Sequence, residues 1–177
     1  MSKRDANDAG GLVGRTHQKA KRAKRAPVDW AAIYGDTAIL FTKKHPVYGA
    51  FSNFVGGAEQ EFQASKFDGI DDEYAAEIRN EVSPAKAKKM GGKKGKIKLN
   101  DDQIKTWNAK RVEVMRRCLR MKFCEGSDFA ALLLSSGDRL IVEKSFWDSF
   151  WGSGRTGKGE NMLGKLLMAR RSELRAM

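Results

Sequence analysis

Apolar residues recur along most of the chain at the spacing of helices rather than of strands. The longest such pattern covers residues 101–123 and a second covers residues 161–175, each with large apolar side chains every three or four positions. One face of each helix is therefore expected in the core. Shorter helices are predicted over residues 58–67, 72–82, 84–90 and 127–134, with Ser83 and Ser127 as N-caps.

Two short runs have the composition of strands. Residues 37–42 are β-prone, and residues 140–142 are continuously apolar, as in a buried strand. Helices and short strands alternate without an internal repeat, which predicts an α+β fold. We expect a single compact domain over residues 29–177, mainly helical with short β-strands, because a chain of 177 residues suits one domain.

The N-terminal residues 1–28 have a different composition and predict a flexible basic arm. Residues 1–30 carry eight basic and three acidic side chains, within a net charge of +12 for the whole chain. Such an excess attracts polyanions, so the arm could bind nucleic acid without sequence specificity or tether an enzyme to it; a solubilising tail without further function is the alternative. The candidate contacts in the arm are Lys19, Lys21, Arg22, Lys24 and Arg25.

Several classes of protein are not expected from this sequence. No apolar run is long enough to cross a bilayer and no secretory signal follows the charged start, so we expect a cytoplasmic protein that does not enter membranes. Cys118 and Cys124 are interpreted as free thiols, and neither has a partner at metal-ligand spacing, so no metal and no cofactor is expected. The phosphate-loop and dinucleotide-binding glycine motifs are absent.

Two segments carry candidate chemistry. Glu59, Phe62, Gln63 and Lys66 fall at i, i+3, i+4 and i+7, which places them along one face of the helix predicted over residues 58–67. Residues 145–161 contain four aromatic side chains around Asp148, followed by four glycines. Glycines let a backbone approach a ligand closely, so this loop suits a phosphate or a ribose hydroxyl.

Taken together, these segments resemble the NADAR, or YbiA-like, family of N-glycosidases over about residues 39–174. The resemblance rests on blocks in one order, with Trp107 ahead of the long helix. The blocks are FSNF at 51–54, EQEFQASKF at 59–67, LIVE at 140–143, DSFWG at 148–152, GKGENMLG at 157–164 and LLMARR at 166–171.

The resemblance implies hydrolysis of the bond between a ribose and a base or amine nitrogen. The substrate classes it implies are ribosylamino-pyrimidine phosphates of riboflavin synthesis and ADP-ribosylated guanine in nucleic acid, and it does not choose between them. The family's catalytic glutamate falls on Glu59, its tryptophan on Trp107 and its second acid on Asp148. One departure concerns substrate preference: the family has a histidine after the glutamate, where this chain has Gln60.

A mechanism follows from this chemistry, because breaking a C–N glycosidic bond builds positive charge on the sugar. We expect Glu59 to act as general base or electrostatic stabiliser and Asp148 to hold the ribose hydroxyls, with the opposite assignment also open. A binding module for ADP-ribosylated or other nucleic acid that has lost catalysis is the alternative. The predicted substrate contacts are Asn53, Phe54, Lys66, Trp107, Trp151, Gly152, Lys158 and Asn161, and at least two of Phe146, Trp147 and Phe150 are expected in the core.

Overall fold

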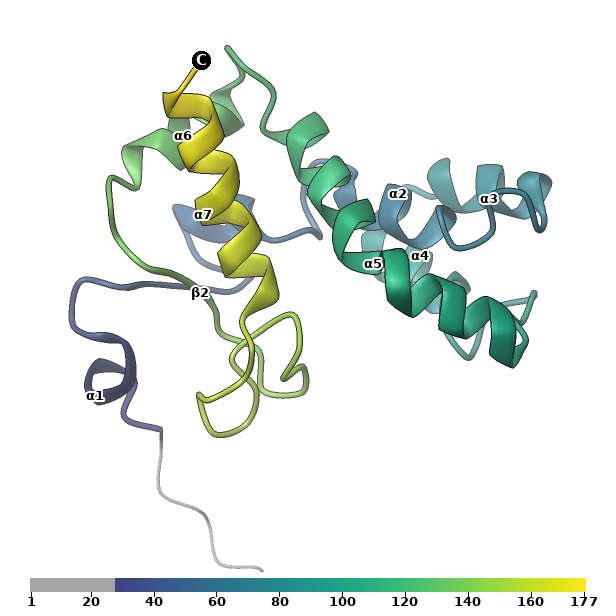
Figure 1. Ribbon diagram of the computed structural model, residues 1–177, viewed down its shortest axis with the longest axis horizontal. Coiled ribbons are helices and arrows are strands. Elements are labelled where there is room, and N and C mark those ends of the chain that lie inside the picture. The colour runs from purple at the N-terminus through teal and green to yellow at the C-terminus, as the bar shows by residue number, and fades with distance from the viewer. Residues whose placement is uncertain (1–27) are drawn as a thin grey trace, which may run out of the picture.

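The computed structural model describes residues 28–177 (Figure 1). The predicted basic arm, with its five candidate nucleic-acid contacts, lies outside the described residues except for Val28. The described chain begins with the short helix α1 (Trp30–Tyr34), which Asp29 caps by accepting a hydrogen bond from the Ala32 amide.

Helices make up most of the regular secondary structure, as the apolar periodicity predicts, and four further helices start at a polar cap. Ser83, Asn100 and Ser127 each accept a hydrogen bond from a backbone amide of the first helical turn, and Asn100 forms a reciprocal capping box with Gln103. Asp71 does the same for its helix. The helices after α1 are the 3₁₀ helix η1 (Tyr48–Phe51), α2 (Ala58–Ala64), α3 (Asp72–Arg79), α4 (Pro84–Met90), α5 (Asp101–Lys122), α6 (Asp128–Ser135) and α7 (Met162–Arg175).

The sheet consists of two short parallel strands that lie far apart in the sequence. Strand β1 (Ile39–Phe41) pairs with β2 (Ile141–Glu143), and Ile39 lies opposite Ile141. Helix α7 packs on β2, and α5 and α6 pack on α7. Because β2 ends directly before the glycine-rich loop, the sheet positions that loop against the rest of the domain.

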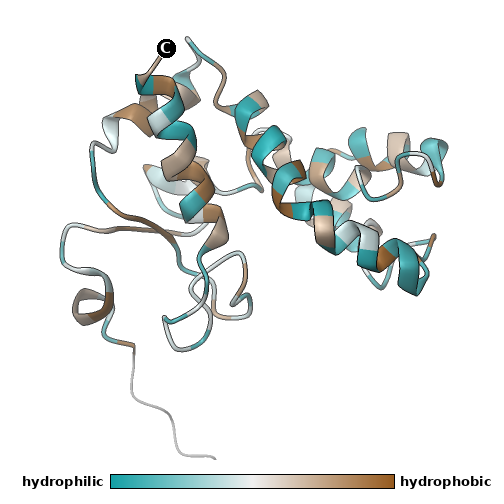
Figure 2. Ribbon diagram, viewed as in Figure 1, coloured by the Kyte–Doolittle hydropathy of each residue, from teal (hydrophilic) through white to brown (hydrophobic). Residues whose placement is uncertain are grey.

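Two apolar clusters hold the domain together. The larger one joins both strands to α5 and α7 and includes Phe41, Met115 and Leu167, each at most 1% exposed. The smaller one lies under α3 and α4 and is centred on Phe67 and Tyr74, whose rings meet edge to face. In Figure 2 the strand β2 is hydrophobic, whereas α5 alternates hydrophobic and hydrophilic residues, as expected for a helix with one buried face.

The structure confirms the predicted fold class, an α+β domain that is mainly helical. The predicted helix over residues 58–67 is shorter than expected: α2 ends at Ala64, and the chain continues in turns to residue 70. The predicted strand over residues 37–42 pairs over three residues only. Among the helices of residues 28–177, none has the length and apolar character needed to cross a membrane.

Candidate active site

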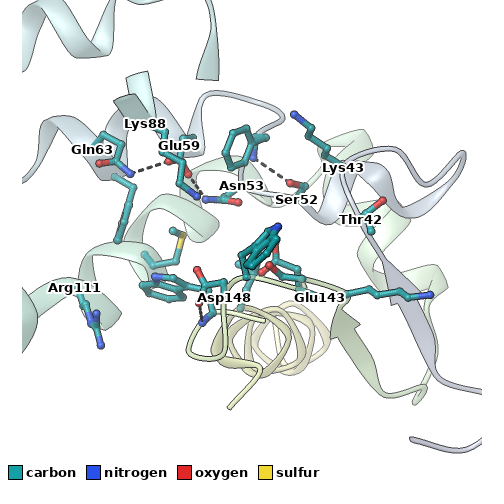
Figure 3. Close-up of a pocket in the computed structure, with 18 of the residues that line it drawn as sticks. Thr42, Lys43, Ser52, Asn53, Glu59, Gln63, Lys88, Arg111, Glu143 and Asp148 are labelled. Carbon is teal, nitrogen blue, oxygen red and sulfur yellow. Dashed lines mark hydrogen bonds between the residues drawn. The ribbon is translucent and has the colours of Figure 1, made fainter. Parts of the chain in front are cut away.

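A cavity of about 530 Å³ opens between α2 and the loop that follows β2. Figure 3 shows Glu59 and Asn53 on one side of it and Glu143 and Asp148 on the other. We call the first side, with Asn53, Glu59, Gln63 and Lys66, the α2 wall, and the second, with Glu143, Trp147, Asp148 and Trp151, the β2 wall. The remaining lining residues are Thr42, Lys43, Ser52, Phe54, Phe62, Lys88, Trp107, Arg111, Met115, Lys144, Ser145 and Leu163.

Glu59 is the buried acid of the α2 wall, with a side chain only 1% exposed. Its two carboxylate oxygens accept hydrogen bonds from the side-chain amides of Asn53 and Gln63. The Asn53 carbonyl also accepts the Glu59 backbone N–H at 2.8 Å, so Asn53 fixes the start of α2 as well as the acid. Burial raises the pKa of Glu59, while the two amide donors and the charges of Lys66 and Lys88 oppose the rise. A carboxylate with a raised pKa is a stronger base near neutral pH than an ordinary one.

Lys66, in the turn that follows α2, is linked to this acid. Lys66 donates to the Gln63 side-chain oxygen and to the Gly91 carbonyl, so Gln63 links it to Glu59. Burial lowers the pKa of Lys66 to about 8. Glu59, Phe62 and Gln63 line the cavity from one face of α2, and Lys66 joins them from the turn that follows the helix.

A second buried lysine holds the Asn53 segment from behind. Lys122, at the end of α5, donates to the carbonyls of Ala50 and Ser52, directly before Asn53. Its side chain is 6% exposed, and burial lowers its pKa to about 7. Sequence patterns do not single out this residue, since a lysine at a helix end is ordinarily exposed.

Asp148 is held on the β2 wall by its own loop. Its Oδ1 accepts hydrogen bonds from the backbone amides of Phe150 and Trp151 at 3.0 and 2.8 Å, so Oδ2 takes no part in this turn. The turn places the Trp151 ring against Phe62 of α2, with centroids 5.4 Å apart and the rings perpendicular. Trp107 of α5 meets the same Phe62 ring from another side at 5.0 Å. The aromatic floor of the cavity thus joins its two walls.

Glu143, the last residue of β2, is a cavity residue that was not among the predicted site residues. Burial, and then the negative charge of Asp148, raises the pKa of Glu143 to about 7. A glutamate at a strand end after an apolar run carries no local signal of such a position. Its place in the LIVE block of the family resemblance was the only available hint.

Phe54 lies at the rim of the cavity between two basic side chains. The amino groups of Lys43 and Lys88 lie 5.1 and 5.2 Å from its ring centroid, within range of a cation–π contact. The basic rim of the cavity consists of Lys43, Lys66, Lys88 and Arg111. Phe54 and Lys66 were predicted as substrate contacts from the sequence, whereas Lys43, Lys88 and Arg111 were not.

The predicted substrate contacts Gly152, Lys158 and Asn161 do not line the cavity. The Asn161 side chain is buried and holds β2, accepting from the Glu143 amide and donating to the Ile141 carbonyl. A side chain on Gly152 would come within 2.6 Å of the Ser145 Cβ, so this glycine allows a close chain crossing. Lys158 is exposed on the far part of the loop.

The expectation that two of the loop aromatics are core residues is wrong. Phe146 is 51% exposed and Trp147 is 85% exposed, and only Phe150 is partly buried. The Phe146 and Trp147 rings pack edge to face on one another and on Arg155 rather than on the core clusters. Trp147 lines the cavity, which makes it a surface that a ligand can reach.

Gln60, which stands where the resemblance leads one to expect a histidine, also lies away from the cavity. Its side-chain amide donates to the Glu81 carbonyl at 3.1 Å, in the connection between α3 and α4. Its Oε1 is buried with no hydrogen-bond partner within residues 28–177. The departure therefore affects the packing of α2 on its neighbours and not a wall of the cavity.

Comparison with known proteins agrees with this architecture. The chain matches the family model of the NADAR domain over residues 40–175. N-glycosidase YbiA of Escherichia coli is 39% identical over 153 residues, which cover 80% of this chain and 91% of that protein. An N-glycosidase of Nostoc punctiforme is 34% identical over 150 residues, which cover 77% of this chain and 92% of that protein.

Two further matches extend the comparison. The chloroplastic riboflavin biosynthesis protein PYRR of Zea mays is 33% identical over 160 residues, which cover 80% of this chain and only 26% of that longer protein. The NMR structure of Escherichia coli YbiA superimposes with a TM-score of 0.66 at 37% identity, covering 80% of this chain and 86% of that one. The chain therefore belongs to the NADAR family. It is an enzyme of the N-glycosidase class, a hydrolase acting on N-glycosyl bonds.

Proposed function

We propose that this N-glycosidase hydrolyses the bond between ribose and a base or amine nitrogen of a phosphorylated, nucleotide-like substrate. The observation that carries the proposal is a buried, raised-pKa acid, Glu59, facing a second acid, Asp148, across a cavity with a basic rim. Each part answers a need of this reaction: negative charge beside the sugar, an aromatic surface for the base, and cations for phosphate.

Glu59 acts on the reacting carbon. The transition state of glycosyl transfer resembles an oxocarbenium ion, so a carboxylate near the anomeric carbon stabilises it or removes a proton from the attacking water. The Asn53 and Gln63 amides keep both oxygens of Glu59 in place, which spares reorganisation as charge develops. Asp148 holds the ribose hydroxyls with Oδ2, while Oδ1 remains bound to its loop.

The rest of the cavity orients the substrate. Phosphate lies at the basic rim, where Lys43 and Lys88 flank Phe54. The leaving base stacks on an indole ring of the cavity, since base–aromatic stacking is favourable for every base. Trp147 is better placed for this than Trp107, because Trp107 is 8% exposed whereas Trp147 is largely open to solvent.

The substrate class has two candidate sources with this shared chemistry. The similarity to PYRR, a riboflavin biosynthesis protein, supports a ribosylamino-pyrimidine phosphate. The basic N-terminal residues support ADP-ribosylated guanine in nucleic acid. Both place a phosphorylated ribose with an N-linked base in the cavity.

The test is incubation of the full chain with each of the two substrates in H₂¹⁸O, followed by mass detection of free base and ribose product. We expect free base together with one ¹⁸O atom in the ribose of the better substrate, as hydrolysis at the anomeric carbon requires. Tight binding of either substrate without base release would contradict the proposal and indicate a binding module.

A further inference from the structure

The three acids of the cavity differ in what their carboxylates already contact. Both oxygens of Glu59 are engaged by side-chain amides, and Oδ1 of Asp148 is engaged by two backbone amides. Glu143 is different: within residues 28–177 its carboxylate has neither an ion pair nor a protein hydrogen bond, although it lies in the same cavity. Among the three acids, it is thus the one whose two carboxylate oxygens are both uncommitted within the described residues.

The backbone of Glu143 is nevertheless fixed on every side. Its N–H donates to the Asn161 side chain at 3.0 Å, and its carbonyl accepts from the amides of Ser145 and Ser153 at 3.0 and 2.9 Å. A rigid backbone with an uncommitted side chain is the arrangement expected of a group that acts on a substrate rather than one that supports the fold.

From this arrangement, which rests on the function proposed above, we propose that Glu143 is the general acid that gives its proton to the leaving nitrogen. Burial raises the pKa of Glu143, and the negative charge of Asp148 in the same cavity raises it further, because two like charges disfavour the ionisation of one of them. The resulting pKa of about 7 keeps a large share of the Glu143 side chain protonated at neutral pH. The Asn53 and Gln63 amides and the charge of Lys66 favour the ionised form of Glu59, whereas the charge of Asp148 disfavours that of Glu143, which suits Glu59 to act as base and Glu143 as acid.

The proton balance of the reaction is complete with these groups. The C1′–N bond breaks, its electron pair goes to the nitrogen, and the nitrogen takes the Glu143 proton. Water forms the new C1′–O bond and gives a proton to Glu59. Glu59 then releases this proton to solvent and Glu143 takes one from solvent, so that both regain their starting states.

Other titrating groups in the cavity must be separated from Glu143. Lys66, with a pKa of about 8, adds a change of activity at higher pH in the wild type and in any Glu143 variant. Lys122, which holds the segment before Asn53, has a pKa of about 7 and titrates in the same range. Only the part of the step near pH 7 that is lost in Glu143→Gln belongs to the proposed acid. The charged side chains that share the cavity with Glu143 are Lys43, Glu59, Lys66, Lys88, Arg111, Lys144 and Asp148.

The experiment compares pH profiles of kcat for the wild type, Glu143→Gln and the control Glu160→Gln, an exposed acid of the same loop. We expect Glu143→Gln to lower kcat by roughly 10²- to 10⁴-fold, the usual contribution of general acid catalysis, and to remove the fall in activity near pH 7. KM should change little, and the control should match the wild type. A Glu143→Gln enzyme that keeps wild-type kcat and the same fall would overturn the assignment and leave the proposed function standing.

Two further measurements keep the outcome clear. Burial raises the pKa of Glu143 in the folded protein above its pKa in the unfolded chain. The ionisation of Glu143 therefore destabilises the folded protein as the pH rises from the lower of these two pKa values through about 7. A folded Glu143→Gln protein should therefore match the wild type in thermal unfolding at pH 4 and exceed it at pH 8. In the wild type itself, a ¹³C NMR titration of the Glu143 carboxyl that is complete below about pH 5.5 would overturn the proposal without any variant.

Discussion

The two walls of the cavity hold their acids by different physical means. On the α2 wall, Glu59 is fixed by side chains, one from its own helix and one from the preceding segment. On the β2 wall, Asp148 is fixed by backbone amides of its own loop. A helix face positions residues by periodicity, so substitutions there change the chemistry of the site. A loop held through backbone bonds couples the site to the local fold, so substitutions there also change stability.

The largest effect is expected at the α2 wall from Glu59→Gln. An amide cannot carry the negative charge that stabilises the oxocarbenium ion or accept a proton from water, so turnover should fall roughly 10²- to 10⁴-fold. The matched control is Glu61→Gln, the same change on the same helix at a residue that pairs with Arg79 outside the cavity. Rates of base release measure both. Equal losses in the two variants would indicate damage to α2 rather than a lost catalytic group.

At the β2 wall, Asp148→Asn and Asp148→Ala should separate charge from loop support. Asparagine keeps an oxygen that accepts the Phe150 and Trp151 amides, so it should preserve stability while lowering turnover roughly 10- to 100-fold through the weaker bond to ribose. Alanine also leaves both amides without their acceptor, which should cost about 1–3 kcal/mol of unfolding free energy.

Chemical denaturation and base release measure these two effects on the same samples. If Asp148→Asn lost as much stability as Asp148→Ala, the difference between the walls would not hold.

A smaller effect is expected from Gly91→Ala, which reaches the α2 wall from outside. The new Cβ would lie 2.3 Å from the Gln63 side-chain oxygen and 2.8 Å from its Cβ, so Gln63 must move from between Glu59 and Lys66. We expect a loss of about 1–3 kcal/mol in unfolding free energy from overpacking and a drop in turnover of roughly tenfold from the displaced side chain. Lys94→Ala, an exposed change in the same connection, is the control, and a Gly91→Ala enzyme that matched it would show that Gln63 does not position Glu59.

The smallest effect on the fold is expected from Trp147→Ala. Because the side chain is 85% exposed, its loss should change unfolding free energy by less than about 0.5 kcal/mol. Loss of stacking on the base should raise KM about fivefold, equivalent to about 1 kcal/mol. Trp147→Phe retains a ring and should recover most of this affinity. An unchanged KM in Trp147→Ala would remove this residue from the binding surface.

The sequence predicts the α2 wall better than the β2 wall for a physical reason. The spacing of Glu59, Phe62 and Gln63 is local, and α2 converts it into one face, with Lys66 following in the next turn. Ser83 and Ser127 likewise cap the predicted helices, because capping is also local.

On the β2 wall the outcome depends on how distant segments cross. Asn161 lies in a glycine-rich segment that predicts a ligand contact, but its side chain holds β2. Trp147 is a large aromatic residue of the kind expected in the core, but it is exposed to solvent. Glu143 becomes a cavity acid only because β2 pairs with β1 and delivers it there. Neither periodicity nor composition contains this information.

The most direct test of the two-walled site is a crystal structure of the Glu59→Gln variant with the better substrate bound. We predict that the anomeric carbon lies within about 3–3.5 Å of the substituted side chain at position 59, or of a water that this side chain holds, as near-attack geometry requires. The ribose hydroxyls should bond to Asp148 on the opposite wall. A substrate whose N-glycosyl bond lay outside this cavity, or whose ribose contacted neither wall, would contradict the two-walled site.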